Sequence, residues 1–133
     1  MKQIIHTLTI LLVFTSCNLS LTENEKRYGL KHKKLLGFKT SILAELGEEK
    51  YFQLEKEVEK GKIETKYIND IIYVSFYEEL NACWQYEGNI EVNNDTIKLN
   101  VILISDEVCT STSIDKVTFL IDNPDMEKKV IMK

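Results

Sequence analysis

The chain has 133 residues and a formal charge of −4, because Asp and Glu outnumber Lys and Arg. This length suits one domain that can bury a core of its own. The acidic balance argues against nucleic acid as a partner, since a phosphate-binding surface needs a basic face. No repeat or low-complexity segment divides the sequence, and we expect one globular domain over residues 30–133.

The first 17 residues, MKQIIHTLTILLVFTSC, have the pattern of an export signal. Lys2 supplies positive charge, Ile4–Phe14 is apolar, and the small residues Thr15 and Ser16 precede Cys17. The apolar run of about 11 residues suits the hydrophobic region of a signal peptide and is too short to span a membrane.

This ending resembles the lipobox of bacterial lipoproteins, although Phe14 stands where that pattern prefers Leu. The resemblance implies a signal peptide at 1–16, a lipidated Cys17 that becomes the first mature residue, and a polar tether over 17–29. It covers only the leader and implies location: the cell envelope, and the outer membrane in a Gram-negative cell. A cleaved signal peptide without lipid and a buried N-terminal helix with an incidental cysteine are the alternatives.

Export changes the meaning of the other two cysteines, because the envelope permits disulfides that a cytosol would reduce. With Cys17 carrying lipid, Cys83 and Cys109 remain as one pair, and we predict that they form a disulfide. The alternative is two small buried thiols. A zinc site is disfavoured, since neither cysteine lies in a CxxC motif and the chain has only two histidines. We expect no metal and no cofactor.

Two segments before residue 61 are predicted to be helical. Over residues 30–46, Leu35, Phe38, Ile42 and Leu46 recur at helical spacing. Residues 48–60 fit either a helix or an alternating strand, and their charge-rich composition favours a helix.

From residue 62 onward the sequence is rich in β-branched and aromatic residues, which indicates strands. Residues 63–68 and 71–78 flank a turn at Asn69 and Asp70. The second of these segments alternates between two largely apolar or aromatic faces, which predicts a central strand.

A hairpin between Cys83 and Cys109 is the clearest structural signal. A two-residue turn at Asn94 and Asp95 requires positive φ angles in a primed turn, which Asn and Asp tolerate. Its register gives one apolar face and sets Glu91 opposite Lys98, whereas a slip of one residue would destroy both faces. The apolar pairs are Val92–Ile97, Ile90–Leu99, Gly88–Val101 and Tyr86–Leu103.

A second hairpin is predicted from residues 116–122 and 127–132, with Val117 opposite Met132, Phe119 opposite Val130, and Pro124 in the turn. These elements predict an α+β fold, with N-terminal helical segments packed on an antiparallel sheet of about six strands. The alternative is an all-β sandwich or small barrel.

The chain lacks the local motifs of common enzymes: it contains no GxSxG, HExxH, phosphate-binding glycine loop or dinucleotide fingerprint. The mature chain has one histidine, His32, in a Lys-rich segment without a nucleophile motif. Carboxylate-pair hydrolysis remains an alternative. Its candidate acids are Glu78, Glu79, Glu87, Asp106 and Glu107.

Tyr73, Tyr77 and Trp84 are the candidate binding surface, because Tyr and Trp combine an apolar body with a polar tip. Packing in the core or at a sheet edge is the alternative for these side chains. The sequence therefore favours a non-catalytic envelope module, anchored through lipid at Cys17, that binds a ligand or an envelope protein or acts as an inhibitor or immunity-type protein. A small envelope hydrolase is the second hypothesis. The oligomeric state does not follow from the sequence.

Overall fold

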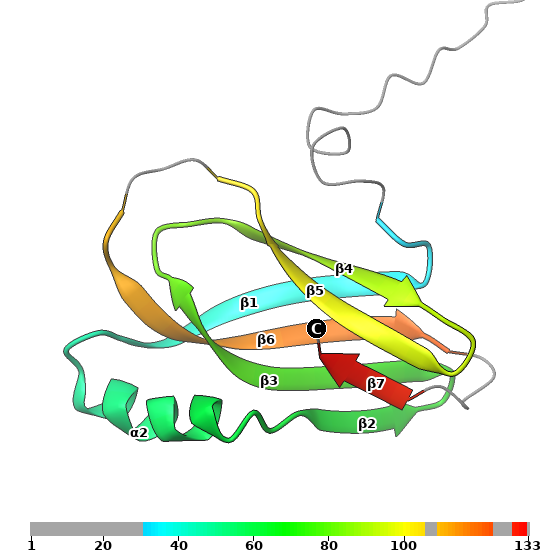
Figure 1. Ribbon diagram of the computed structural model, residues 1–133, viewed down its shortest axis with the longest axis horizontal. Helices are drawn as coiled ribbons and strands as arrows, with labels where there is room; N and C mark the ends of the chain where they lie inside the picture. The colour runs from blue at the N-terminus through cyan, green and yellow to red at the C-terminus, as the bar shows by residue number, and fades with distance from the viewer. Residues whose placement is uncertain (1–30, 106–108, 124–128, 133) are drawn as a thin grey trace, which may run out of the picture.

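The computed structural model describes residues 31–105, 109–123 and 129–132, and in these segments seven strands form two sheets (Figure 1). The four-stranded sheet has the order β1 (Leu35–Glu45), β6 (Thr112–Asp122), β3 (Ile71–Asn81), β2 (Glu64–Ile68). The three-stranded sheet has the order β4 (Tyr86–Val92), β5 (Thr96–Leu103), β7 (Lys129–Met132). The helix α2 (Glu49–Glu59) lies beside the end of the larger sheet where β1 ends and β6 begins.

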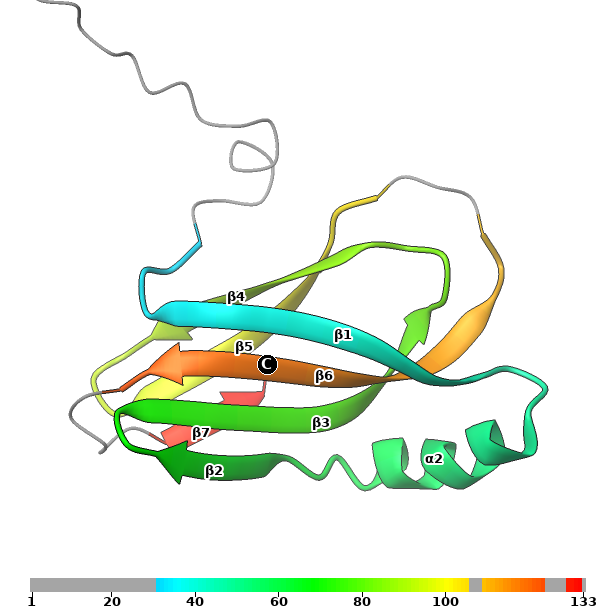
Figure 2. The same cartoon turned by 180° about the vertical axis from the view of Figure 1, so that it is seen from behind.

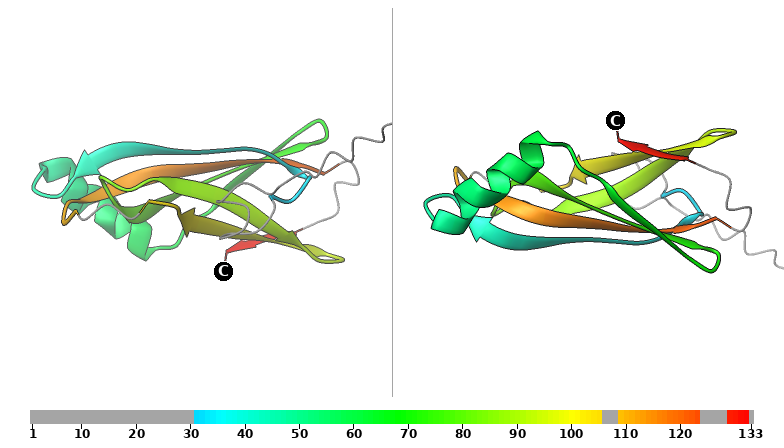
Figure 3. Two further views of the ribbon diagram at one scale, coloured as in Figure 1. Left: turned by 90° about the horizontal axis from the view of Figure 1, so that it is seen from above. Right: turned by 90° about the horizontal axis from the view of Figure 1, so that it is seen from below.

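The two sheets lie face to face as layers of a sandwich, as the edge-on views show (Figure 3). Their facing side chains form one apolar core with contributions from β3 and β6 on one side and β4 and β5 on the other. Ile72, Val74, Val117, Phe119 and Ile121 are fully buried there. We call the core-facing side of the four-stranded sheet its inner face, and the opposite side, toward the viewer in Figure 2, its outer face.

The predicted α+β fold is therefore wrong, and the mainly β architecture fits the alternative, a sandwich. The error lies in the helix predicted over residues 30–46, because Leu35–Glu45 form the long strand β1 instead. Its pairing with β6 shifts register between Leu35 and Gly37 and again between Ile42 and Ala44. Such a bulge inserts one extra residue and resets the alternation of faces. Leu35 and Phe38 thus pack on the same core although they are three residues apart, which imitates helical spacing.

The helix predicted over residues 48–60 is confirmed as α2. Its apolar residues Tyr51, Leu54 and Val58 follow helical spacing and pack on Ala44 of β1 and Ile114 of β6. Gly61 follows the helix with a φ of 57°, a left-handed conformation that glycine adopts at no steric cost. The helix thereby covers one end of the outer face.

The central hairpin is confirmed with the predicted register over its full length. Val92 pairs with Ile97, Glu91 with Lys98 and Tyr86 with Leu103. Ile90, Ile97 and Leu99 are buried in the sandwich core, as the apolar face predicted. The expected primed turn is wrong, because Asn69 is the one non-glycine residue with positive φ in the described segments, and Asn94 and Asp95 adopt other conformations.

The turn at Asn69 and Asp70 is confirmed, and β3 lies between β2 and β6 as a central strand. The second predicted hairpin is wrong. β6 lies between β1 and β3, whereas β7 joins the other sheet and runs parallel to β5, with Val130 beside Ile97. The alternation of apolar and polar residues shows which face of a strand is buried, but it does not identify the strand with which it pairs. Pro124 lies outside the described residues.

Three phenylalanines join β1, β6 and β3 on the inner face. The ring centroid of Phe119 lies 5.0 Å from that of Phe38 and 6.2 Å from that of Phe76. Gly88 of β4 packs directly against this cluster: a Cβ atom there would overlap the ring of Phe38 and lie 2.9 Å from Phe119. The close approach of the two sheets at this point requires glycine.

The predicted disulfide joins Cys83 and Cys109, whose Cα atoms are 6.0 Å apart. Cys83 lies in the β3–β4 connection and Cys109 lies just before β6. Asn81 positions both: its side-chain Nδ2 donates to the carbonyl of Cys109 at 2.7 Å, and its Oδ1 accepts from the N–H of Cys83 at 3.0 Å. The bridge therefore closes the open end of the hairpin.

A pocket between the helix and the four-stranded sheet

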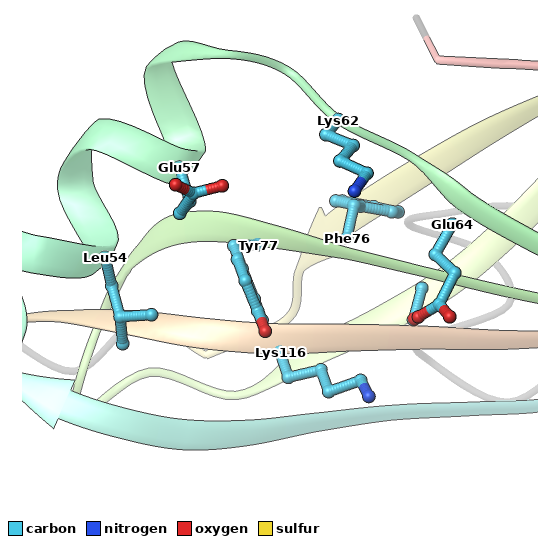
Figure 4. Close-up of a pocket in the computed structure, with 8 residues that line it drawn as sticks. Leu54, Glu57, Lys62, Glu64, Phe76, Tyr77 and Lys116 are labelled. Atoms are coloured by element: carbon cyan, nitrogen blue, oxygen red, sulfur yellow. The ribbon is translucent and has the colours of Figure 1, made fainter.

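A pocket of about 420 Å³ lies between α2, β2 and β3 (Figure 4). The pairing of β2 with β3 begins at Glu64, which lies opposite Ser75, so within the described residues the remainder of β3 has no strand on this side. α2 packs farther along the sheet, and the space between the two elements stays open. We call this site the lysine pocket; its lining residues are Leu54, Glu57, Lys62, Glu64, Ser75, Phe76, Tyr77 and Lys116.

The helix side of the pocket is built on the apolar packing of α2. Leu54 belongs to the buried stripe of α2 and packs against the cluster of Ala44, Tyr51 and Ile114. Burial and the nearby carboxylates of Glu79 and Glu55 raise the pKa of Tyr51, which is 3% exposed. The helix end of the pocket is thus fixed by apolar packing.

Both carboxylates of the pocket already have lysine partners outside its lining. Glu57 pairs with Lys60 at 2.6 Å, and Glu64 pairs with Lys66 at 2.8 Å. The hydrogen bond and charge of each lysine lower the pKa of its carboxylate partner, so both acids stay ionised at neutral pH.

The two lysines that line the pocket differ from these acids in their ion pairing. Within the described residues, neither Lys62 nor Lys116 forms an ion pair. Lys62 comes from the segment between α2 and β2, and Lys116 comes from β6. In Figure 4 they approach from two sides of β3, with the hydroxyl end of Tyr77 directed toward Lys116. When Lys60 and Lys66 are included, four lysines surround the two acids of the pocket, on a protein that is acidic as a whole.

Hydroxyl groups continue from the pocket along the outer face. The register of β3 and β6 sets Tyr77 opposite Lys116, Ser75 opposite Thr118 and Tyr73 opposite Leu120. Hydrogen bonds with Ser75 and Thr118, followed by the influence of Lys116, lower the pKa of Tyr73. Ser75 also donates to Glu64 at 3.4 Å. This surface is therefore rich in hydrogen-bond donors.

The structure brings together two of the three predicted binding residues. Tyr73 and Tyr77 share the outer face, and Tyr77 lines the lysine pocket. Trp84 lies apart from them, in the β3–β4 connection next to the disulfide. The sequence reading missed Lys62 and Lys116. Alternation along β6 could have identified Lys116 as an outward residue, whereas no local pattern connects Lys62 with it.

The candidate acids of the hydrolase hypothesis lie in separate places. Glu87 pairs with Lys31 at 3.4 Å, Glu79 lies near Tyr51, and Asp106 and Glu107 lie outside the described residues. Glu78 lies opposite Asp115, an acid that the sequence reading did not consider.

Glu78 and Asp115 form a pair of carboxyl groups on neighbouring strands of the inner face. Asp115 is 5% exposed and accepts a hydrogen bond of 2.6 Å from Ser113. Glu78 has a buried Oε2 without a hydrogen-bond partner among the residues that the structure describes, and desolvation raises its pKa. Its side-chain face is opposite to that of Tyr77, because the two residues are adjacent in one strand.

Comparisons with known proteins identify no relative: the chain matches no protein-family model, and no curated protein or solved structure is significantly similar to it. Across the segments that the structure describes, no helix has the length and apolar character needed to cross a membrane. In the same segments His, Cys, Asp and Glu side chains form no group of three or more that could hold a metal ion. Cys17, the leader and the tether lie outside the described residues.

Proposed function

We propose that this protein is a lipid-anchored module of the cell envelope that binds a small ligand in the lysine pocket without converting it chemically. The observation that carries the proposal is the pocket itself. Its volume lies in the range of organic ligand sites, and its lining combines apolar side chains with a few polar groups, as such sites generally do. The lipobox-like leader supports the envelope location.

The state of the acids favours binding over hydrolysis. Carboxylate-pair hydrolysis needs one acid with a raised pKa to protonate the leaving group. The pKa values of Glu57 and Glu64 are both lowered by their lysine partners. Glu78 has a raised pKa, but its side chain lies on the inner face. The pocket therefore offers no general acid among its carboxylates.

A matched pair of helix variants tests the binding function. Glu57→Trp places a large ring at the pocket, whereas Gln53→Trp places the same ring on an exposed position of α2 outside it. We expect ligand-observed NMR with a fragment library to detect binders to the full chain in phospholipid nanodiscs. These binders should be retained by Gln53→Trp and lost in Glu57→Trp. An absence of binders, or equal binding by both variants, contradicts the proposal.

The anchor is tested separately by Cys17→Ser. The unaltered protein should incorporate a labelled lipid and fractionate with membranes, whereas the variant should not incorporate the label. Persistent labelling and membrane association in the variant would show that Cys17 is not the anchor.

A further inference from the structure

We infer that the ligand of the lysine pocket is an organic anion, with a carboxylate or phosphate ester carried on an apolar body. This inference rests on the proposed function and specifies the chemistry of its ligand. Three independent features of the site support it: its unbalanced charge, its hydroxyl donors and its apolar wall.

The charged lining residues are two lysines and two glutamates, and the neighbouring Lys60 and Lys66 make the surroundings of the site positive. Lys60 and Lys66 form the close ion pairs with Glu57 and Glu64, whereas Lys62 and Lys116 act on these acids only through weaker charge interactions. The complete chain carries −4, so the pocket departs in sign from the protein around it. Lys62 is exposed and Lys116 is half-buried, so an anion placed between them is attracted by both lysines, most strongly at low ionic strength.

Hydroxyl donors lie on the same wall as the lysines. Ser75 lies on β3 beside Glu64, and Tyr77 lies two residues farther along, opposite Lys116. Hydroxyls and ammonium groups together can donate several hydrogen bonds to the oxygens of one carboxylate or phosphate. Tyr73 lies next along this face, outside the pocket lining, and hydrogen bonds with Ser75 and Thr118 lower its pKa.

The rest of the wall is apolar. Leu54 of α2 lines the pocket, and the ring of Tyr77 lies between the helix and the lysines (Figure 4). Phe76 also borders the pocket, although its ring packs on Phe119 in the core. An inorganic ion would leave these surfaces in contact with water. A ligand with a hydrocarbon or aromatic body would cover them, and burial of apolar area adds to its affinity.

A matched probe series tests this chemistry with the full chain in nanodiscs. The probes are 3-phenylpropionate, phenyl phosphate, 3-phenylpropylamine, 3-phenylpropanol and inorganic phosphate, and binding is measured by calorimetry. We expect at least one of the two aromatic anions to bind about tenfold more tightly than the amine, the alcohol and inorganic phosphate. Lys62→Gln and Lys116→Gln should each lower the affinity for that anion by about tenfold. Lys33→Gln, an exposed lysine outside the pocket, is the charge-matched control and should change little.

The outcomes separate this inference from the function on which it rests. Tighter binding of the amine or the alcohol at the pocket overturns the anion assignment and leaves the binding function standing. Equal affinity for inorganic phosphate overturns the apolar requirement. Equal losses in all three lysine variants show a nonspecific charge effect and overturn the assignment of Lys62 and Lys116. Binding of no probe overturns the inference, and only the additional failure of the fragment library contradicts the proposed function.

Discussion

The inner and outer faces of the four-stranded sheet are built by the same strands and have different chemistry. On β3, the inward residues Ile72 and Val74 are fully buried, whereas Tyr73 between them is partly exposed on the outer face. On β6, the buried Val117 follows Lys116, which lines the pocket. The alternation of a strand therefore lets one face stabilise the sandwich while the other carries a polar site.

Loss of the disulfide should weaken the sandwich most. The bridge spans a sequence separation of 26 residues, and the chain-entropy estimate for such a loop is about 3–4 kcal/mol. We expect a Cys83→Ala, Cys109→Ala double variant to lose about that free energy of unfolding in urea denaturation. The lysine pocket lies away from the bridge, so the folded variant should keep its ligand affinity. A stability loss below about 1 kcal/mol would contradict the estimate.

Alanine substitutions at two glycines compare how tightly the inner and outer faces are packed. Gly88 contacts Phe38 and Phe119 in the core, and Gly88→Ala should cost about 1–3 kcal/mol because the added methyl group overpacks this contact. Gly37 meets the flexible end of Leu120, 3.3 Å from an added Cβ, on the outer face. Gly37→Ala should change the unfolding free energy by less than about 1 kcal/mol. Equal costs in urea denaturation would contradict the distinction.

Two acids should show opposite pH dependence. Desolvation raises the pKa of Glu78, so its ionisation costs stability as pH rises from the unfolded value of about 4.3 through the folded value. Glu78→Gln should therefore be more stable than the unaltered protein at neutral pH, with the difference shrinking in acid. Urea unfolding measured from pH 3 to 8 checks this expectation.

Glu64, on the outer face, should show a pH dependence of opposite sign to that of Glu78. Lys66 lowers its pKa, so its contribution is present above about pH 4.3 and is lost as pH falls through the folded value. Glu64→Gln should be slightly less stable than the unaltered protein at neutral pH, and the two should converge in acid. The same sign for Glu64→Gln and Glu78→Gln would contradict the assigned environments.

The sequence was sufficient for the central hairpin because several constraints agreed there. One register placed every apolar pair on one face and set Glu91 opposite Lys98, and the structure has that register. It was insufficient for β1, where two register shifts break the alternation on which strand recognition depends. It also assigned β7 to the wrong partner, because alternation does not distinguish between antiparallel β6 and parallel β5.

The pocket was predictable only in part for a similar reason. Tyr77 was identified from its aromatic type and its position in an alternating strand. Four strands, β2 to β5, separate Lys62 from Lys116 in the sequence, and only the tertiary packing around β3 brings the two lysines to one site. Their proximity depends on tertiary contacts, which no local sequence pattern predicts.

The division between the two faces is tested most directly at two adjacent residues of β6. Val117→Ala removes two methyl groups from a fully buried side chain and should lower the unfolding free energy by about 2 kcal/mol, while the folded protein keeps its affinity for the best-bound aromatic anion. Lys116→Gln should change the unfolding free energy by less than about 0.5 kcal/mol and lower the affinity for that anion about tenfold. Urea unfolding and calorimetric titration of both variants should give this crossed result. If Lys116→Gln destabilises the protein as much as Val117→Ala, or if its affinity for the anion is unchanged, the account of the two faces is wrong.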